Sequence, residues 1–370
     1  MNTKFFSSFA EEIELFQAIY KVIRRGDFVF GAEVFKLEER LATFLSMRHG
    51  IGVGSGTEAI IYALRALHIG HGDEVITTPY GCVPHAEAII AVGAKPVFVD
   101  VRTANFRMDE WKIEERLTPD VKTILAVHPF GESIQLDHVG MIAQRHALYI
   151  IEDITQTFGA EWRGKKVGSF GAAACLSFHP GKPLSGIGEG GMVITNDEEM
   201  ANLIRALRNN GVQEPSDFHL NHIRVGGNGR LDTIQAAALL IRFAHWQERC
   251  RERQVVARQY HQHLKGIGDL NLPATVEGYP SEHIYWQYVI RTSHAQGLTA
   301  WLIENEVMAR RMYPVPIHLQ PAYRFLRHSI GSFPNAEAAA REGVALPLIG
   351  DEVFKVSETI RQFFKAHNSQ

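Results

Sequence analysis

Residues 177–191 read Ser-Phe-His-Pro-Gly-Lys-Pro-Leu-Ser-Gly-Ile-Gly-Glu-Gly-Gly, and they lie between two short apolar runs. We expect these runs, Ala172–Phe178 and Met192–Thr195, to be strands that are antiparallel or joined by an irregular connection. Glycine and proline fix the backbone between them and leave few side chains to obstruct a ligand. Lys182 is the single lysine of the segment, and a partly desolvated lysine amine can form a Schiff base. The alternative is a solvated lysine in a surface hairpin.

The composition excludes several classes of protein. The 370 residues allow about two domains, and the net charge of -3 gives no sign of a surface that binds nucleic acid or a membrane. No apolar stretch approaches the ~18 residues of a membrane span, and the N-terminus lacks the apolar region of a signal peptide. Cys82, Cys175 and Cys250 form neither a CxxC pair nor a disulfide framework. We therefore expect a cytoplasmic protein without a metal site.

Short apolar runs alternate with helical patterns through the first half of the chain. The runs lack strict alternation, which is typical of strands that helices bury on both faces. Repeated strand–helix units predict an α/β fold with a doubly wound, mostly parallel sheet and a ligand site beyond the carboxyl ends of the strands. The expected strands are Gly50–Val53, Glu74–Thr78, Lys95–Val101, Thr123–Val127 and Leu148–Glu152. The expected helices are Glu11–Arg25, Ala32–Leu45, Ser55–Leu67, Val83–Val92, Met108–Leu117 and Leu136–His146.

The second half of the chain has a different pattern. A long helical segment, Thr233–Leu264, carries arginines among glutamates, which indicates a solvated face and not a nucleic-acid patch. The elements expected after it are a strand at Tyr285–Arg291 and helices at Ala300–Glu306, Ala336–Glu342 and Asp351–Lys365. We predict a large α/β domain over residues 1–240 and a smaller C-terminal α+β domain over residues 241–370.

Two further features lie upstream of the lysine segment. Asp153 follows a predicted strand, so its carboxylate lies where an α/β sheet binds a ligand, although a helix N-cap is the alternative role. Ser55-Gly56-Thr57 opens a helix after another strand, and the free N–H groups of such a helix start attract a phosphate. Many serine and threonine caps bind nothing, and the chain has neither a GxGxxG motif nor a P-loop.

The three features together fit pyridoxal phosphate. The lysine would form the Schiff base, the acid would keep the pyridine nitrogen protonated, and the helix start would hold the phosphate.

The order and spacing of the motifs resemble the DegT/DnrJ/StrS family of sugar aminotransferases. The resemblance extends from Gly31 to about Leu348. The matching stretches are Glu152-Asp153 with Gln156, Ser177-Phe178-His179 with Lys182, Gly188–Gly191, Gly227–Asp232 with Gln235-Ala236-Ala237, and Tyr313-Pro314 with Pro316-Ile317-His318.

This resemblance implies a fold type I pyridoxal phosphate enzyme that cycles through the pyridoxamine form. Lys182 corresponds to the Schiff-base lysine, Asp153 to the acid at the pyridine nitrogen, and Gln156 to the residue beside the ring hydroxyl. Asn228 corresponds to a phosphate contact from the other subunit of a homodimer. The remaining expected phosphate contacts are Gly56, Thr57 and Ser177, and the expected substrate contacts are His179, Tyr313 and His318. For His318, a loop histidine in a turn between two prolines is the alternative.

One position departs from the family pattern. Many members place an aromatic residue over the cofactor ring, and here that position corresponds to Cys82. Tyr80 is close but two residues away, so either Tyr80 swings in or a softer contact replaces the stacking. Stacking of this kind contributes about 1 kcal/mol.

The resemblance implies transamination from an amino acid, with glutamate expected, to a nucleotide-linked ketosugar such as a dTDP-keto-deoxysugar. The run Arg230–Thr233 favours amination at carbon 3 over carbon 4. A cyclitol ketone is an alternative substrate. A related sugar dehydratase is disfavoured because dehydratases of this family carry histidine where Lys182 stands. A regulatory protein without catalysis is disfavoured because Lys182, Asp153 and Gln156 are intact.

Overall fold

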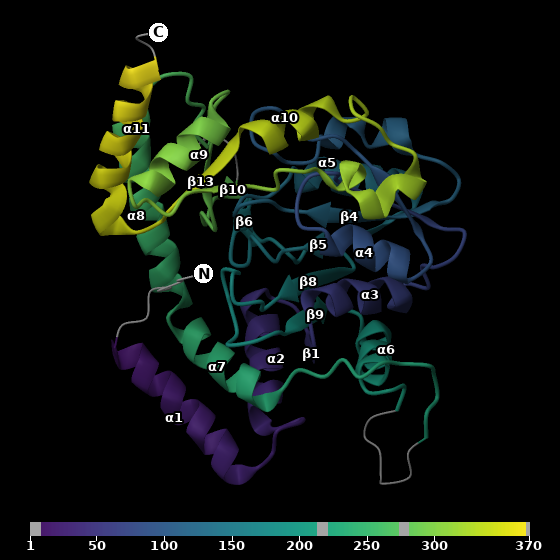
Figure 1. The fold of residues 1–370 in the computed structure, drawn as a ribbon. Coiled ribbons are helices and arrows are strands. Elements are labelled where there is room, and N and C mark those ends of the chain that lie inside the picture. The colour runs from purple at the N-terminus through teal and green to yellow at the C-terminus, as the bar shows by residue number, and fades with distance from the viewer. Residues whose placement is uncertain (1–8, 213–220, 274–280, 368–370) are drawn as a thin grey trace.

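A computed structural model describes residues 9–212, 221–273 and 281–367. A seven-stranded sheet forms its centre (Figure 1). The strand order is β1 (His49–Val53), β9 (Gly191–Thr195), β8 (Ala173–Ser177), β5 (Tyr149–Asp153), β4 (Val121–Val127), β2 (Glu74–Thr77) and β3 (Lys95–Phe98). Strand β9 runs antiparallel to both of its neighbours, and the other pairings are parallel. The predicted α/β fold with a mostly parallel sheet is confirmed.

Helices cover both faces of this sheet. One face packs against α2 (Ala32–Phe44), α5 (Leu136–His146) and α7 (Thr233–Ala244), and the other against α3 (Gly56–Ala66), α4 (Pro84–Ala91) and α6 (Glu198–Arg208). Successive residues of β4 alternate between the two cores: Ile124 and Ala126 face one, and Leu125 faces the other. Burial on both faces explains why the strands are continuous apolar runs. Helix α1 (Phe9–Arg25) packs outside this layer, against α7.

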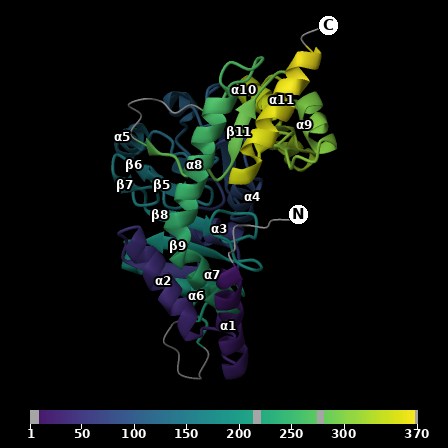
Figure 2. The same cartoon turned by 90° about the vertical axis from the view of Figure 1, so that its left-hand side faces the viewer.

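The C-terminal elements enclose a separate apolar core. A three-stranded sheet of β11 (Tyr288–Arg291), β13 (Gly343–Leu346) and β12 (Arg310–Arg311) packs with α8 (Trp246–Leu264), α9 (Ala295–Glu304) and α11 (Val353–His367). Figure 2 shows α8 running from the large sheet toward these elements, where it lies beside α11. Helix α10 (Pro334–Glu342) precedes β13, and the short strands β6 (Glu161–Trp162), β7 (Lys165–Lys166) and β10 (Ser281–Glu282) form a third sheet. None of the helices described is long and apolar enough to span a membrane.

The helical segment after the large sheet differs from the sequence prediction. It is not one helix, because the chain leaves helical geometry at His245, between α7 and α8. Trp246 still packs in the core of the large sheet, whereas Val256 packs in the C-terminal core. Side chains of α8 therefore pack in both cores.

Two other secondary-structure expectations need correction. The helix expected at Met108–Leu117 consists of two short 3-10 turns, Glu110–Lys112 and Glu114–Arg116. The carboxylate of Glu110 is fully buried and accepts a hydrogen bond from the backbone of Gln135 at 2.7 Å, so a tertiary contact overrides the local pattern. Helix α6 was not expected, although Asp197 caps it by accepting from the Met200 N–H.

The close packing of α2 on β1 can be tested at Gly50. A Cβ atom added there would lie 2.4 Å from the carbonyl oxygen of Glu38, a backbone atom that cannot rotate away. We expect Gly50→Ala to lower the free energy of unfolding by about 1–3 kcal/mol, as overpacking does. Gly140, inside α5, has nothing within 4 Å of such a Cβ, so Gly140→Ala should leave the stability unchanged or raise it by up to about 1 kcal/mol. Denaturant unfolding followed by circular dichroism compares the two variants, and equal effects would contradict this packing.

Candidate active site

The loop that carries Lys182 connects the antiparallel strands β8 and β9 and is held by helix α7. The amide oxygen of Gln235 accepts hydrogen bonds from the N–H groups of Ile187 and Gly188 at 2.9 and 3.0 Å. The guanidinium of Arg242 donates to the carbonyl oxygen of Ser185 at 2.7 Å. These hydrogen bonds hold the loop against α7, so α7 helps to define the conformation of the loop and the position of Lys182.

The amine of Lys182 lies between a thiol and an aromatic ring. Its Nζ donates to the Sγ of Cys82 at 3.4 Å and lies 5.0 Å from the ring centroid of Trp286. The indole N–H of Trp286 donates to the carbonyl oxygen of Gly181, so the ring is tied to the same loop. Lys182 is therefore a partly enclosed amine and not a solvated surface lysine. Trp286 was missed in the sequence analysis because it is more than a hundred residues away in the chain.

Gln156 and Tyr313 complete this side of the site. The Gln156 Nε2 donates to the Tyr313 hydroxyl at 3.2 Å, and its Oε1 accepts from the Phe130 N–H at 2.9 Å. The Tyr313 hydroxyl lies 3.1 Å from the Sγ of Cys82. Burial, together with the neighbouring Cys82, raises the pKa of Tyr313 well above its usual value, so the hydroxyl stays protonated. The structure thus brings Cys82, Gln156, Lys182 and Tyr313 together.

Cys82 occupies the position at which many family members have an aromatic residue that stacks on the cofactor ring, and the structure shows which rings lie near it. Tyr80 does not swing in: its side chain is buried, its hydroxyl donates to the Met312 carbonyl oxygen at 3.1 Å, and its ring stacks on Phe106. The rings beside the Cys82 thiol come instead from Tyr313 and, across Lys182, from Trp286.

Asp153 ends strand β5 at the edge where the sheet is expected to bind a ligand. Its Oδ1 accepts from the Thr155 N–H at 3.0 Å, and the Thr155 hydroxyl accepts from the Ser177 N–H at 3.1 Å. The residues that follow form a turn and not a helix, so Asp153 caps no helix. The neighbouring Glu152 is fully buried and accepts from three backbone N–H groups, those of Gly168, Phe170 and Gly171.

The start of helix α3 forms a small polar cradle. The Ser55 hydroxyl accepts from the Glu58 N–H at 3.1 Å, and the N–H groups of the first turn have no acceptor within the helix. Gly56 lies against Ser177 so closely that an added Cβ would come within 2.4 Å of the Ser177 Cβ. Backbone donors and a hydroxyl are thus grouped at the sheet edge that Asp153 ends. An amine, a carboxylate and an anion cradle in this arrangement fit pyridoxal phosphate.

The side chains of three of the predicted site residues, His179, His318 and Asn228, make no hydrogen bond or ion pair with the group around Lys182 among the described residues. His179 is exposed, accepts from the Gly181 N–H, and lies 3.8 Å from the carboxylate of Glu189. His318 is buried, with its Nε2 3.2 Å from Glu337. Burial lowers the pKa of His318, although Glu337 acts in the opposite direction.

The third of these residues, Asn228, is exposed, and its backbone pairs with Asn209. The roles of His179, His318 and Asn228 stay predictions.

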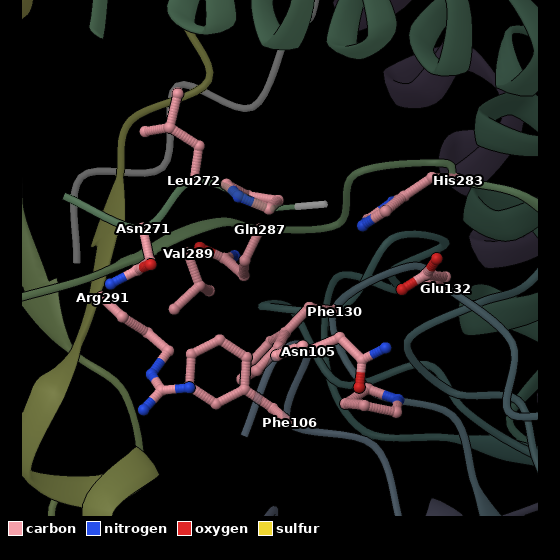
Figure 3. Close-up of a pocket in the computed structure, with 13 residues that line it drawn as sticks. Asn105, Phe106, Phe130, Glu132, Asn271, Leu272, His283, Gln287, Val289 and Arg291 are labelled. Carbon is pink, nitrogen blue, oxygen red and sulfur yellow. The ribbon is translucent and has the colours of Figure 1, made fainter. Parts of the chain in front are cut away.

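A small cavity lies between residues of the large-sheet region and residues of β11. Figure 3 shows it between Phe106 and Phe130 on one side and Val289 and Arg291 on the other. Its free volume is about 20 Å³, which is room for about one water molecule. The Phe130 ring, which lines this cavity, also stacks on that of Tyr313, with the centroids 5.9 Å apart.

The fold and the site define a pyridoxal phosphate-dependent aminotransferase. Comparison with known proteins agrees: the profile of the DegT/DnrJ/EryC1/StrS aminotransferase family matches residues 10–360, and the chain belongs to this family. The resemblance and the cofactor expected from the sequence are thereby confirmed.

Three similar proteins illustrate the range of the family. The chain is 38% identical to a pleiotropic regulatory protein of Geobacillus stearothermophilus, with 95% of both chains covered. It is 36% identical to the UDP-2-acetamido-2-deoxy-3-oxo-D-glucuronate aminotransferase of Pseudomonas aeruginosa, with 89% of both covered. The crystal structure of S. venezuelae DesV in complex with a ketimine intermediate superimposes with a TM-score of 0.91 at 34% identity, covering 96% of this chain and 95% of DesV.

The cradle at α3 can be tested by adding one methyl group. Gly56→Ala would push the start of α3 away from Ser177, so the N–H groups of its first turn would leave the position that we expect for the cofactor phosphate. We expect the affinity for pyridoxal phosphate to fall at least about tenfold, a loss of about 1.4 kcal/mol. Absorbance titration of the cofactor-free protein measures this, with Gly140→Ala as the control. If the affinity of Gly56→Ala for pyridoxal phosphate is unchanged, the start of α3 does not bind the phosphate.

Proposed function

We propose that this protein transfers an amino group from an amino acid to a keto sugar carried on a nucleotide. The main support for this proposal is a group of side chains around the Lys182 amine, formed by Cys82, Gln156 and Tyr313. This group lies at the sheet edge that also holds Asp153. The relative from Pseudomonas aeruginosa named above supports the substrate class, because its name specifies a UDP-linked 3-oxo sugar. That name also supports carbon 3 as the aminated position.

Each residue of the group has a distinct task in this proposal. Bound pyridoxal phosphate supplies an aldehyde that reacts with amines and a protonated ring that withdraws electrons. Lys182 would hold the cofactor through its amine, and when free that amine would carry the proton between the donor α-carbon and the cofactor. Asp153 would accept the hydrogen bond of the pyridine nitrogen and so keep that nitrogen protonated. Gln156, whose Oε1 accepts from the Phe130 N–H, would lie beside the ring hydroxyl.

A regulatory protein without catalysis is the second candidate, since the Geobacillus stearothermophilus relative carries a regulatory name. The described residues of the site give no indication that this protein has lost catalytic activity. In the described part of the chain no ion pair of Lys182 is found, Gln156 contacts Tyr313 beside it, and Asp153 is present at the end of β5.

A substrate panel tests the function. We expect the purified protein with glutamate to aminate a member of a panel of UDP- and dTDP-linked keto sugars, with the product identified by mass and NMR. Borohydride reduction should fix the cofactor to Lys182, as peptide mapping would show. Lys182→Ala should lower turnover at least about a hundredfold, the scale of a lost acid–base group. A cofactor-loaded protein that aminates no keto sugar would contradict the proposal, as would a label on another lysine.

We also propose that the protein is a homodimer with shared active sites. Asn228 is exposed in its own chain, and large apolar side chains are exposed nearby: Val225 is 83% exposed, Val29 is 47% exposed and Phe28 is 46% exposed. The backbone of Val29 pairs with Asp232, and the Phe28 carbonyl oxygen accepts from the Thr233 N–H, so these residues flank the Asn228 stretch. An apolar surface around a polar residue is what a subunit interface with a bridging contact requires.

Mixed dimers test this sharing. Asn228→Asp would set a carboxylate against the phosphate of the partner's cofactor, and Lys182→Ala removes the amine, so each homodimer should be nearly inactive. In a mixed dimer one site collects both changes and the other collects neither. Random reassortment makes about half of the dimers mixed, so about a quarter of all sites should recover. The two variants are unfolded and refolded together and assayed against each refolded alone, with wild type as the refolding control. If the mixture shows no more activity than the separately refolded variants, Asn228 does not contribute to the active site of the partner subunit.

A further inference from the structure

The thiol of Cys82 is a nucleophile to which the proposed mechanism gives no task. Its Sγ accepts a hydrogen bond from the Nζ of Lys182 at 3.4 Å and lies 3.1 Å from the Tyr313 hydroxyl oxygen. Cys82 and Lys182 are both half-buried, so a small solute can reach the pair from solvent. A thiol and a primary amine do not react with each other as they are, because both are nucleophiles. They can be joined once the sulfur has been oxidised.

The contact between Cys82 and Lys182 is held from both sides of the site. The segment that leads to Cys82 is held by the Ile317 N–H, which donates to the Pro79 carbonyl oxygen at 2.8 Å. The loop of Lys182 is held by the indole N–H of Trp286, which donates to its backbone at 3.0 Å. The flexible four-carbon stem of a lysine lets the amine move toward the sulfur while both backbones stay in place. A reaction between the two groups is therefore intramolecular and favoured by proximity.

The other two cysteines have surroundings that disfavour oxidation. Burial raises the pKa of Cys175 well above its usual value, and the carboxylate of Asp153 raises it further. Burial also raises the pKa of Cys250 to about 11. Because the thiolate is the form that attacks a peroxide, both of these cysteines react slowly at neutral pH.

We propose that Cys82 and Lys182 form a modification site, at which a peroxide joins the two side chains in a sulfenamide. In the first step the sulfur attacks the peroxide: an S–O bond forms, the O–O bond breaks, and the peroxide is reduced to water or an alcohol. In the second step the neutral amine attacks the sulfenic acid of Cys82: an S–N bond forms and the S–O bond breaks. Water leaves with the hydroxyl of the sulfenic acid and one proton of the amine. The joined pair has lost two hydrogen atoms, which matches the two electrons that the peroxide accepts.

The modification would block the amine that the proposed function assigns to the cofactor. The amine of Lys182 cannot hold pyridoxal phosphate while it is bonded to sulfur, and it cannot attack sulfur while it holds the cofactor. A thiol such as dithiothreitol reverses the link, because its thiolate attacks the sulfur of Cys82 and releases the amine, and a second thiol group then frees Cys82. The link itself depends only on the two side chains, whereas its effect on cofactor binding rests on the proposed role of Lys182.

Peptide mapping by mass spectrometry tests the modification. Cofactor-free protein is treated with hydrogen peroxide and digested without a reductant. We expect a cross-linked pair of peptides that contains Cys82 and Lys182 and is lighter by two hydrogen atoms than the sum of the two peptides. Dithiothreitol should remove the link, and pyridoxal phosphate that is bound before the peroxide is added should prevent it.

Three variants identify the two partners. Cys82→Ser removes the sulfur and Lys182→Ala removes the amine, so neither should form the cross-link. Cys250→Ser is the matched control, since Cys250 is the other half-buried cysteine, and it should form the link like wild type. Uptake of pyridoxal phosphate after peroxide is compared with the untreated sample of the same variant. We expect it to fall by the cross-linked fraction in wild type and Cys250→Ser and to stay unchanged in Cys82→Ser.

The results that would overturn the proposal are distinct from those that would overturn the proposed function. Oxidised Cys82 beside an unmodified Lys182 would reject the modification, as would a link that retains an oxygen atom or joins Lys182 to another cysteine. A cross-link between Cys82 and Lys182 that leaves cofactor uptake unchanged would support the modification and contradict the proposed role of Lys182. If a variant fails to fold, the peptide map of wild type decides, because it identifies both linked residues directly.

Discussion

The site depends on one close backbone approach, between the start of helix α3 and the paired strands β8 and β9. A Cβ added at Gly191 would lie 2.3 Å from the Ser55 carbonyl oxygen, and one added at Gly56 would collide with Ser177. Ser177 and Gly191 are themselves opposite each other in the β8–β9 ladder. Glycine at these two positions lets the start of α3, the proposed phosphate site, reach the strands that flank Lys182. Any larger side chain would separate the anion cradle from the amine.

The antiparallel direction of strand β9 also helps to bring Lys182 to the site. A parallel strand after β8 would require a crossover connection, usually a helix, that returns to the opposite edge of the sheet. Because β9 is antiparallel to β8, the connection between them stays at the carboxyl end of β8, and Lys182 lies in it. Helix α7 then fixes that loop through Gln235 and Arg242, so the position of the lysine depends on residues about fifty positions later.

An aromatic cluster joins the two domains on the far side of the site. The rings of Tyr80, Phe106, Phe130 and Tyr313 contact one another with centroids between 5.4 and 6.3 Å apart. Tyr80 is used in this packing, which explains why it cannot take over the place of a stacking ring. Tyr313, from the C-terminal domain, reaches Gln156 and Cys82 from the same cluster. Residues of the large-sheet region and of the C-terminal elements therefore meet at the site.

The amino-acid sequence by itself determined the class of this protein, because the signals involved are local. Runs of buried strand residues, the glycine turn at Gly56 and the glycine-rich loop of Lys182 each act within a few positions, and helix α5 has the predicted bounds. Local patterns failed where a distant partner decides the outcome. Glu110 is drawn into the core by the Gln135 N–H, and α7 and α8 separate at His245 as the chain leaves one core for the other.

Only the tertiary structure decided which side chains surround the amine. Trp286 and Tyr313 approach Lys182 and Cys82 from elements more than a hundred residues later in the chain. Such contacts join residues that are far apart in the chain, and no spacing in the sequence encodes them. Burial is equally non-local: one histidine side chain, His179, is exposed to solvent, and another, His85, is buried. This difference in environment exists only after the chain has folded.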